Sequence, residues 1–319
     1  MEMKQKTKEK GITLVALVIT IVILIILSTI TINAAFGEGG LIEKAQQAKN
    51  LTEQATLKEQ ESLNSLISEY ANIMAEDENT PTEPEEQEEP PIDKVNSKVG
   101  YYADIDGNKT VDGIIYADLA VAKSGQWSDS DGAYSYSAIT NTKDYYVSQT
   151  NYEGPFGTKD VLTAMDGDGQ DRFYVMALTD FNPGTYYCWY ADAYDNMNDY
   201  ATATSGNFGT GSTNTGTMIS KWNGSVYGTQ NTGSYSDMWG AIQDEVAKGW
   251  FVPSRGEWSA FADNLGITDE NYGDYGLSAY YWSSSQNNSN NACNAAFNLG
   301  CINFNDVNYY NYVRLSTTF

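Results

Sequence analysis

The chain has 319 residues, which is more than one typical domain and predicts about two structural units. Its formal charge is −24, with only 18 Lys and Arg residues, so it lacks the positive charge that nucleic-acid binding needs and we expect no nucleic-acid partner. Histidine is absent, which excludes imidazole metal ligands and catalytic systems built on a histidine base. The three cysteines, Cys188, Cys293 and Cys301, do not have the spacing of a metal site, and a disulfide between two of them stays open.

The N-terminal region has the pattern of a membrane anchor. Four lysines within residues 1–11 precede an uncharged apolar stretch, 12–35, that is long enough to cross a bilayer as a helix. The basic flank predicts a cytoplasmic N-terminus, with the chain after about residue 36 outside the cell. A cleaved secretory signal is the alternative, although the apolar stretch is long for one.

The junction KGITLVALVITIVIL resembles the leader of type IV prepilins. The resemblance implies that prepilin peptidase cuts after Gly11, that Ile12 becomes the mature N-terminus, and that pilus subunits are partners. That family usually has Glu at the fifth mature position, where this chain has Ala16, and this difference argues against incorporation into a filament. The alternative is a plain membrane anchor.

Two further segments separate the anchor from the C-terminal domain. Residues 36–74 have apolar side chains at helical spacing among Glu, Gln and Lys, which predicts an amphipathic stalk helix. Residues 75–94 are acidic, rich in proline and nearly free of apolar residues, which predicts an extended linker. The remaining residues, 95–319, are expected to form the folded ectodomain.

The ectodomain has short apolar runs broken by glycine, typical of a β-rich fold with long loops. The segment 99–120 predicts a hairpin around an Asp-Gly turn, and 171–181 predicts a strand. Helices are predicted at 218–222 and 239–248. A further helix is expected to begin near Ser254, because Glu three residues later completes a capping box.

The segments VPSRGEW and YWSSS resemble domains of the C-type-lectin-like superfamily. The resemblance covers 235–319 well and 100–234 loosely. It implies an α+β fold: a twisted antiparallel sheet, two helices and long loops.

Residues 280–314 form an Asn-rich stretch, YYWSSSQNNSNNACNAAFNLGCINFNDVNYYNYVR. Apolar residues such as Ala295, Phe297 and Ile302 alternate in it with polar or small residues, which predicts strands with one buried and one presented face. Because Asn favours turns over strands, so many asparagines indicate selection for a surface rather than for stability.

The other residues at the presumed exposed positions share a property of their codons. An Asn codon, AAC or AAT, becomes Tyr, Ser, Cys, Asp, Phe, Leu or Ala when only its adenines are replaced. The stretch resembles the variable region of the target proteins of diversity-generating retroelements, in which adenine-directed reverse transcription rewrites Asn-rich codons. The frame YWSSSQNNSNNA, the turn at Gly300 and the segment NYVRLS carry this resemblance. The alternative is an Asn-rich surface strand pair without diversification.

The resemblance implies a variable region at 282–314 with two classes of residue. The expected variable, ligand-binding positions are Asn287, Asn288, Asn290, Asn291, Cys293, Asn294, Ala296, Asn298, Leu299, Cys301, Asn303, Phe304, Asn305, Asp306, Asn308, Tyr309, Tyr310 and Asn311. The expected framework residues are Trp282, Ala295, Phe297, Gly300, Ile302, Val307, Val313 and Arg314. We expect Arg314, and Arg255 with it, to pair with carboxylates inside the fold.

Two acidic clusters are candidate metal sites, and otherwise we expect no cofactor. The second is Asp166, Asp168 and Asp171, for which a turn rich in Asp and Gly is the stronger alternative. The first begins like a calcium loop but lacks the glycine at the sixth position and the closing glutamate. Its residues are Asp104, Asp106, Asn108 and Asp112. A hairpin turn rich in Asp and Gly is the alternative. The sugar-binding signatures of calcium-dependent lectins, Glu-Pro-Asn and Trp-Asn-Asp, are absent.

We expect no enzymatic activity and no catalytic residues. The formylglycine-generating enzymes share the C-type-lectin-like superfamily and use a cysteine pair, but Cys293 and Cys301 fall at presumed variable positions. A reactive thiol also needs an electropositive setting, which this chain does not favour.

These observations predict a variable receptor or adhesin at the cell surface, anchored in the membrane or associated with a pilus. Its partner would be a protein or another cell-surface ligand. The alternatives are a minor pilin-like structural subunit and an adhesin of fixed specificity.

Overall fold

The computed structural model describes residues 90–128 and 130–319. The expected leader, membrane helix and stalk, and most of the acidic linker, lie outside these residues. Within the described ranges, no helix combines the length and apolar character needed to cross a membrane.

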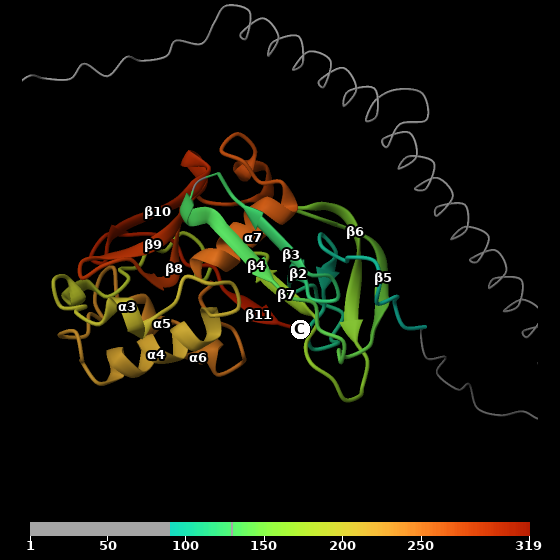
Figure 1. The fold of residues 1–319 in the computed structure, drawn as a ribbon, viewed down its shortest axis with the longest axis horizontal. Coiled ribbons are helices and arrows are strands. Elements are labelled where there is room, and N and C mark those ends of the chain that lie inside the picture. The colour runs from blue at the N-terminus through green and yellow to red at the C-terminus, as the bar shows by residue number, and fades with distance from the viewer. Residues whose placement is uncertain (1–89, 129) are drawn as a thin grey trace, which may run out of the picture. The chain divides into compact units, whose positions relative to one another are not determined.

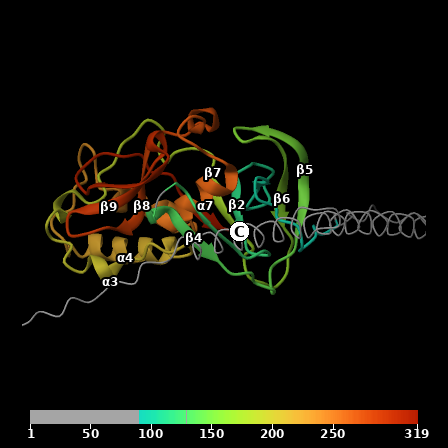
Figure 2. The same cartoon turned by 45° about the horizontal axis from the view of Figure 1, so that its top comes forward.

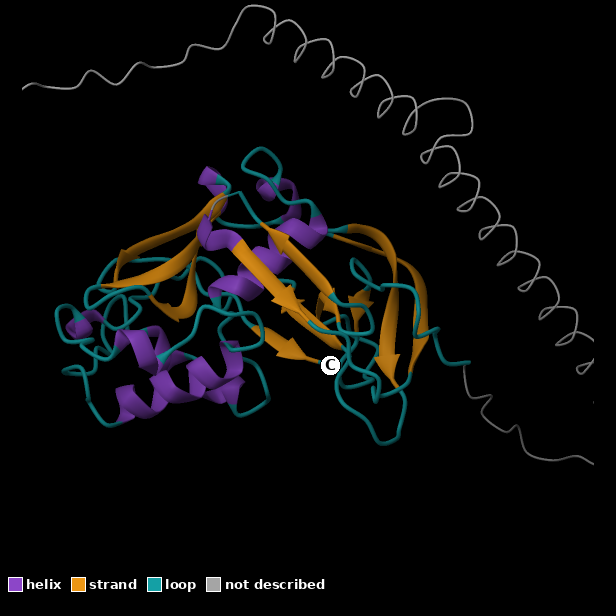
Figure 3. Cartoon of the chain, viewed as in Figure 1, coloured by secondary structure: helices purple, strands orange, loops and turns teal. Residues whose placement is uncertain are grey.

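The described residues form one compact unit of helices and sheets, which confirms the α+β class (Figures 1 and 3). Its strands are β1 (Tyr102–Ala103), β2 (Gly113–Asp118), β3 (Lys123–Gln126), β4 (Ala133–Tyr136), β5 (Tyr145–Gly154), β6 (Gly157–Ala164), β7 (Phe173–Ala177), β8 (Tyr280–Gln286), β9 (Asn291–Ala296), β10 (Cys301–Asp306) and β11 (Ser316–Thr318). Its helices are α3 (Tyr200–Ala203), α4 (Gly211–Asn223), α5 (Met238–Ala241), α6 (Gln243–Val246) and α7 (Arg255–Leu265). Single 3₁₀ turns are η1 (Ser130–Gly132), η2 (Ala191–Ala193), η3 (Tyr272–Tyr275) and η4 (Phe297–Leu299).

The larger sheet has the strand order β11-β7-β2-β1-β6-β5. β1 pairs antiparallel with β2, with Tyr102 opposite Ile114, which confirms the predicted hairpin. β7 confirms the strand expected within 171–181. β11 pairs with β7, so the C-terminal end of the chain completes the sheet that the first strands begin.

The predicted helices are present with different limits. The helix expected at 218–222 begins earlier, at Gly211, and the one expected at 239–248 breaks at Ile242 into α5 and α6. The first half of α4 is rich in Ser, Thr and Gly, so its sequence has no helical periodicity of apolar residues. Buried polar contacts hold it instead: the side-chain amide of Asn214 donates to the hydroxyl of Ser284 at 3.2 Å.

Helix α7 lies between the two larger sheets and contacts β2, β4, β8, β9 and β10 (Figures 1 and 2). Its predicted capping box is confirmed, because Ser254 accepts from the N–H of Glu257 and the Glu257 side chain accepts from the N–H of Ser254. The fully buried Glu257 carboxylate also accepts from the N–H groups of Gly209 and Gly211, at 3.0 and 3.1 Å. It therefore joins the start of α4 to the start of α7.

The folded domain begins inside the segment expected to be linker. Ile92 packs against a hydrophobic cluster, and its N–H donates to the carbonyl of Tyr145 at 2.7 Å. Arg172, fully buried, donates to the carbonyl of Asp93 at 2.9 Å. The single apolar residue Ile92 explains the shift, because it provides a side chain to bury.

Burial raises the pKa of Glu257 from 4.5 to about 7, and the backbone N–H groups around it limit the rise. A carboxyl whose pKa is higher in the folded state stabilises the fold fully below pH 4.5, and this stabilisation is lost as the pH rises through 7. We expect Glu257 to lower the free energy of unfolding by about 3 kcal/mol across that window, measured by urea denaturation. The surface variant Glu270→Gln is expected to keep this dependence. An unchanged dependence in Glu257→Gln would contradict the assignment.

Candidate ligand-binding face

Strand β8 anchors the three-stranded sheet, β10-β9-β8, that carries the candidate face. Trp282 is fully buried and donates its indole N–H to the carbonyl of Tyr187 at 2.8 Å. Trp258 donates to the carbonyl of Trp282 at 3.2 Å, and Trp189 to that of Ser283 at 2.8 Å. Three indole side chains therefore fix this strand in addition to its pairing with β9.

The expected framework residues are all buried, and the six apolar ones other than Gly300 divide between two hydrophobic clusters. One cluster contains Ala295, Phe297 and Ile302, and the other contains Trp282, Val307 and Val313. Gly300 adopts φ +64° at the end of η4, where the chain turns into β10 and a side chain would be strained.

Strand β9 is buried on both faces, which corrects the expectation that its variable positions point outward. Cys293 packs in one hydrophobic cluster and its neighbour Ala292 in the other. The expected variable positions Cys293, Asn294 and Ala296 are at most 3 % exposed. Because a hydrophobic cluster covers each face of β9, alternation in its sequence does not mark an exposed face.

Asn311 is the fourth expected variable position that the structure buries, at 2 % exposure. Its backbone pairs with that of Tyr187 through two hydrogen bonds, at 3.0 and 3.2 Å, which hold it in place.

The buried Asn294 is unusual, because neither atom of its side-chain amide has a hydrogen-bond partner among the described residues. Leaving such groups unpaired costs about 1–3 kcal/mol, so stability does not explain this asparagine.

The exposed part of the expected variable region extends from the turn before β10 to the loop after it. Its large apolar side chains are about half exposed: Leu299 at 53 %, Phe304 at 50 %, Tyr309 at 59 % and Tyr310 at 51 %. Asn298 and Asn308 are exposed as well. The partly exposed positions are Asn287, Asn288, Asn290, Asn291, Cys301, Asn303, Asn305 and Asp306.

Residues 308–310 form a short exposed loop that is held at both ends. At its start, the carbonyl of the buried Val307 accepts from the N–H groups of Trp189 and Tyr190, at 3.0 and 3.2 Å. At its end lies Asn311, paired with Tyr187. The loop therefore presents its side chains from a fixed backbone.

Aromatic residues outside the variable region extend the face, and sequence reasoning did not identify them. Tyr235, half exposed, stacks on Tyr310 with ring centres 4.2 Å apart. Tyr186, 41 % exposed, contacts Tyr312 with ring centres 4.3 Å apart and hydroxyls 2.7 Å apart. The high tyrosine content is the only signal of these residues in the sequence, because each tyrosine pair joins loops that lie far apart in the chain.

Some asparagines of the stretch shape the turn between β8 and β9 instead of presenting side chains. The side-chain oxygen of Asn288 accepts from the N–H groups of Asn290 and Asn291, at 2.8 and 2.9 Å. The amide of Asn291 donates to Asp306 at 2.6 Å and ties the turn to the end of β10. These positions combine turn formation with partial exposure.

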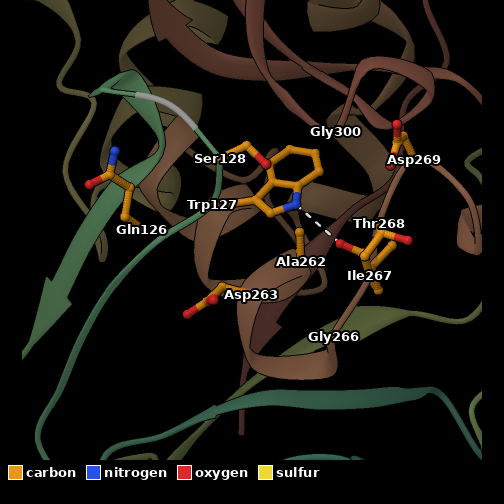
Figure 4. Close-up of a pocket in the computed structure, with 10 residues that line it drawn as sticks. All are labelled: Gln126, Trp127, Ser128, Ala262, Asp263, Gly266, Ile267, Thr268, Asp269 and Gly300. Carbon is orange, nitrogen blue, oxygen red and sulfur yellow. Dashed lines mark hydrogen bonds between the residues drawn. The ribbon is translucent and has the colours of Figure 1, made fainter.

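A shallow pocket of about 300 Å³ lies beside Gly300, near the middle of the expected variable region (Figure 4). Gly300 lines it together with Trp127, whose indole N–H donates to the carbonyl of Ile267 at 3.1 Å. Asp263 and Asp269 are its acidic lining residues. The pocket adds a concave surface beside the exposed Leu299 turn.

The thiols of Cys188 and Cys293 are free and buried. Burial raises the pKa of Cys293 to about 11 and that of Cys188 to about 12, so both are protonated at neutral pH. A protonated, buried thiol is a poor nucleophile.

Among the described residues, one acidic cluster brings carboxylates together. Oxygens of Asp104, Asp106 and Asp112 lie within 4.8 Å of one another. In the second acidic segment, Asp171 pairs with Lys143 at 2.7 Å, and Asp168 is exposed.

No protein-family model matches this chain, and no curated protein or solved structure matches it either. The functional interpretation therefore rests on the residues of the chain itself.

Arg314 supports the face from beneath through an interior ion pair. It is 1 % exposed and lies 2.7 Å from Asp180, which also accepts from the hydroxyl of Tyr281 at 2.7 Å. Arg255 differs from the expectation, because its partner, Asp131, lies 3.3 Å away at the surface. The difference follows from exposure, because the Arg255 and Asp131 side chains are 35 % and 58 % exposed.

We expect Arg314→Ala to lower the free energy of unfolding by about 3 kcal/mol, since it leaves the Asp180 carboxylate, only 10 % exposed, without its cation. The matched variant Arg255→Ala removes a partly exposed pair and is expected to cost less than about 1 kcal/mol. Chemical denaturation of both variants measures the difference. Equal effects would show that the Arg314 pair does not hold the framework.

One substitution separates buried from exposed variable positions. We expect Ala296→Tyr to destabilise the domain by about 3 kcal/mol or more, because a ring must enter a packed interior. Asn308→Tyr introduces the same side chain in the exposed loop and is expected to change stability by less than about 0.5 kcal/mol. Thermal unfolding of both variants measures the difference. Similar melting temperatures would contradict the assignment of position 296 to the interior and of position 308 to the surface.

Proposed function

We propose that this protein is a surface-displayed ligand-binding protein whose recognition face is diversified by adenine-directed retroelement mutagenesis. The main observation is that the exposed large apolar residues of the stretch are ones that an Asn codon can become. Leu299, Phe304, Tyr309 and Tyr310 are each reachable from an Asn codon by replacing adenines, and each is about half exposed. Exposed aromatic residues that adjoin one another, as Tyr310 and Tyr235 do, are typical of interaction sites.

Recognition would use rigid aromatic side chains with adaptable polar neighbours. Tyr309, Tyr310 and Phe304 offer large contact areas with few rotatable bonds, and the surrounding asparagines offer donors and acceptors. Antibody loops use the same division between aromatic anchors and adaptable hydrogen bonds. A few such anchors supply most of the binding energy in a typical interface.

The buried framework supports this proposal because it separates folding from recognition. The residues that hold the three-stranded sheet are buried, whereas the side chains of 308–310 are exposed. Replacement of these exposed residues leaves both hydrophobic clusters intact. A face of this kind tolerates many sequences on one fold.

The proposal also includes the type of fold and the location of the protein. We propose a C-type-lectin-like domain carried outside the cell on a membrane helix with a prepilin-like junction at Gly11 and Ile12. The partners would then be prepilin peptidase, the membrane, and an external protein or cell-surface ligand.

A structural role in a pilus is the second candidate, and the KGITL junction favours it. Ala16 stands where pilins usually have glutamate, and a structural subunit gains nothing from a mutable exposed face. An adhesin of fixed specificity has the same N-terminus and the same exposed aromatic residues. Only the history of the Asn-rich codons separates it from a diversified receptor.

The deciding experiment is to sequence the DNA that flanks the gene. We expect a near copy of codons 282–314 beside a reverse-transcriptase reading frame, with differences almost only where the copy has adenine. Codons 293 and 296 give the most informative comparison. If the copy has AAC or AAT at these codons, the buried Cys293 and Ala296 arose by replacement of adenines. Absence of both a copy and a reverse transcriptase would favour a fixed adhesin or a pilin head.

A further inference from the structure

The loop between β1 and β2 gathers three carboxylates with no cationic side chain paired to them. Oxygens of Asp104, Asp106 and Asp112 lie within 4.8 Å of one another. Eight of the described Lys and Arg residues form ion pairs with other acids, such as Arg172 with Asp118 at 2.7 Å. None of the ion pairs among the described residues includes a member of this cluster.

Asp104 has an unsatisfied oxygen inside this cluster. Its side chain is 1 % exposed, and its Oδ1 has no hydrogen-bond partner in the described part of the chain. Oδ2 accepts from the N–H of Lys109 at 3.0 Å and, at 3.4 Å, from the hydroxyl of Thr163. A buried carboxylate with one unpaired oxygen is strongly disfavoured unless a cation compensates it.

Other buried acids of the domain are compensated, which makes Asp104 an exception. Asp118 has the buried guanidinium of Arg172, bound through both oxygens at 2.7 and 2.8 Å. Asp237 lacks a cation but accepts from the N–H groups of Ala191 and Asn231 and from the indole of Trp222, at 2.7–2.9 Å. The structure thus satisfies buried carboxylates elsewhere and leaves this one open.

We propose that the loop of residues 104–112 binds a calcium ion through the carboxylates of Asp104, Asp106 and Asp112. Oxygen ligands of this type suit a hard divalent cation. Calcium accepts irregular oxygen arrangements, whereas magnesium demands near-ideal octahedral geometry, so an irregular loop favours calcium.

The structure answers one of the two objections that the sequence raised. A calcium loop needs a left-handed residue at its sixth position, usually glycine, and Lys109 occupies that position with φ +70°. The closing glutamate remains absent, because the twelfth position is Ile115 in β2. We therefore expect weak binding, with a dissociation constant of about 10⁻⁴–10⁻³ M, as in extracellular modules.

The ion would stabilise the start of the ectodomain and leave the variable face untouched. The loop joins β1 to β2, and the N–H of Asp104 donates to Leu162 of β6 at 2.9 Å. β5 and β6 lie at the opposite end of the domain from β9 and β10 (Figures 1 and 2). Calcium binding here is independent of which side chains occupy the variable positions.

The test is thermal unfolding of the full-length chain in detergent, first in EDTA and then with CaCl₂ at about one hundred times the dissociation constant. We expect calcium to raise the melting temperature by about 5–10 °C. Asp106→Asn removes an exposed ligand without disturbing the interior and is expected to abolish most of the shift. Asp104→Asn is expected to melt at the same or a higher temperature than the unaltered chain in EDTA, and to gain nothing from calcium.

Asp166→Asn combined with Asp168→Asn is the matched control, because it removes two exposed acids from the other acidic loop. This variant is expected to keep the full calcium shift. The proposal is overturned if the unaltered chain shows no shift, or if Asp106→Asn keeps it. An equal shift with MgCl₂ would overturn the assignment to calcium.

Discussion

The structure depends on the fixation of β8 by tryptophan side chains. Indole N–H groups are donors only, so each buried tryptophan must find a carbonyl, and three of them meet on or beside this strand. Trp189, Trp258 and Trp282 come from three separate parts of the chain. Their hydrogen bonds bring these parts together, and β9 and β10 then follow by pairing outward from β8.

This order of pairing divides the Asn-rich stretch into an inner and an outer part. β9 lies between two strands and two hydrophobic clusters, so its residues belong to the interior whatever their codons. β10 is the last strand of its sheet, and Phe304, opposite the buried Cys293, is half exposed. Exposed and partly exposed side chains of the stretch are therefore concentrated along β10 and the loop that follows it.

The sequence predicted those elements whose signals are local. The capping box at Ser254 and Glu257, the hairpin around the loop 104–112 and the strand β7 are all present. The start of α4 was missed because its Ser, Thr and Gly residues are held by tertiary contacts. Two features depend on neighbours that are distant in the sequence: the burial of Asn294 and the contribution of Tyr235 to the face. The alternation of apolar and polar residues along a strand cannot reveal such neighbours.

The stacking of Tyr235 on Tyr310 has a consequence for binding kinetics. A ring held by a neighbour before the ligand arrives loses less rotational freedom when it is immobilised in a complex. Pre-organisation of this kind lengthens the lifetime of a complex more than it speeds the encounter. Tyr235 lies outside the expected variable stretch, so its ring stays available to stack on an aromatic residue at position 310 and to favour slow dissociation.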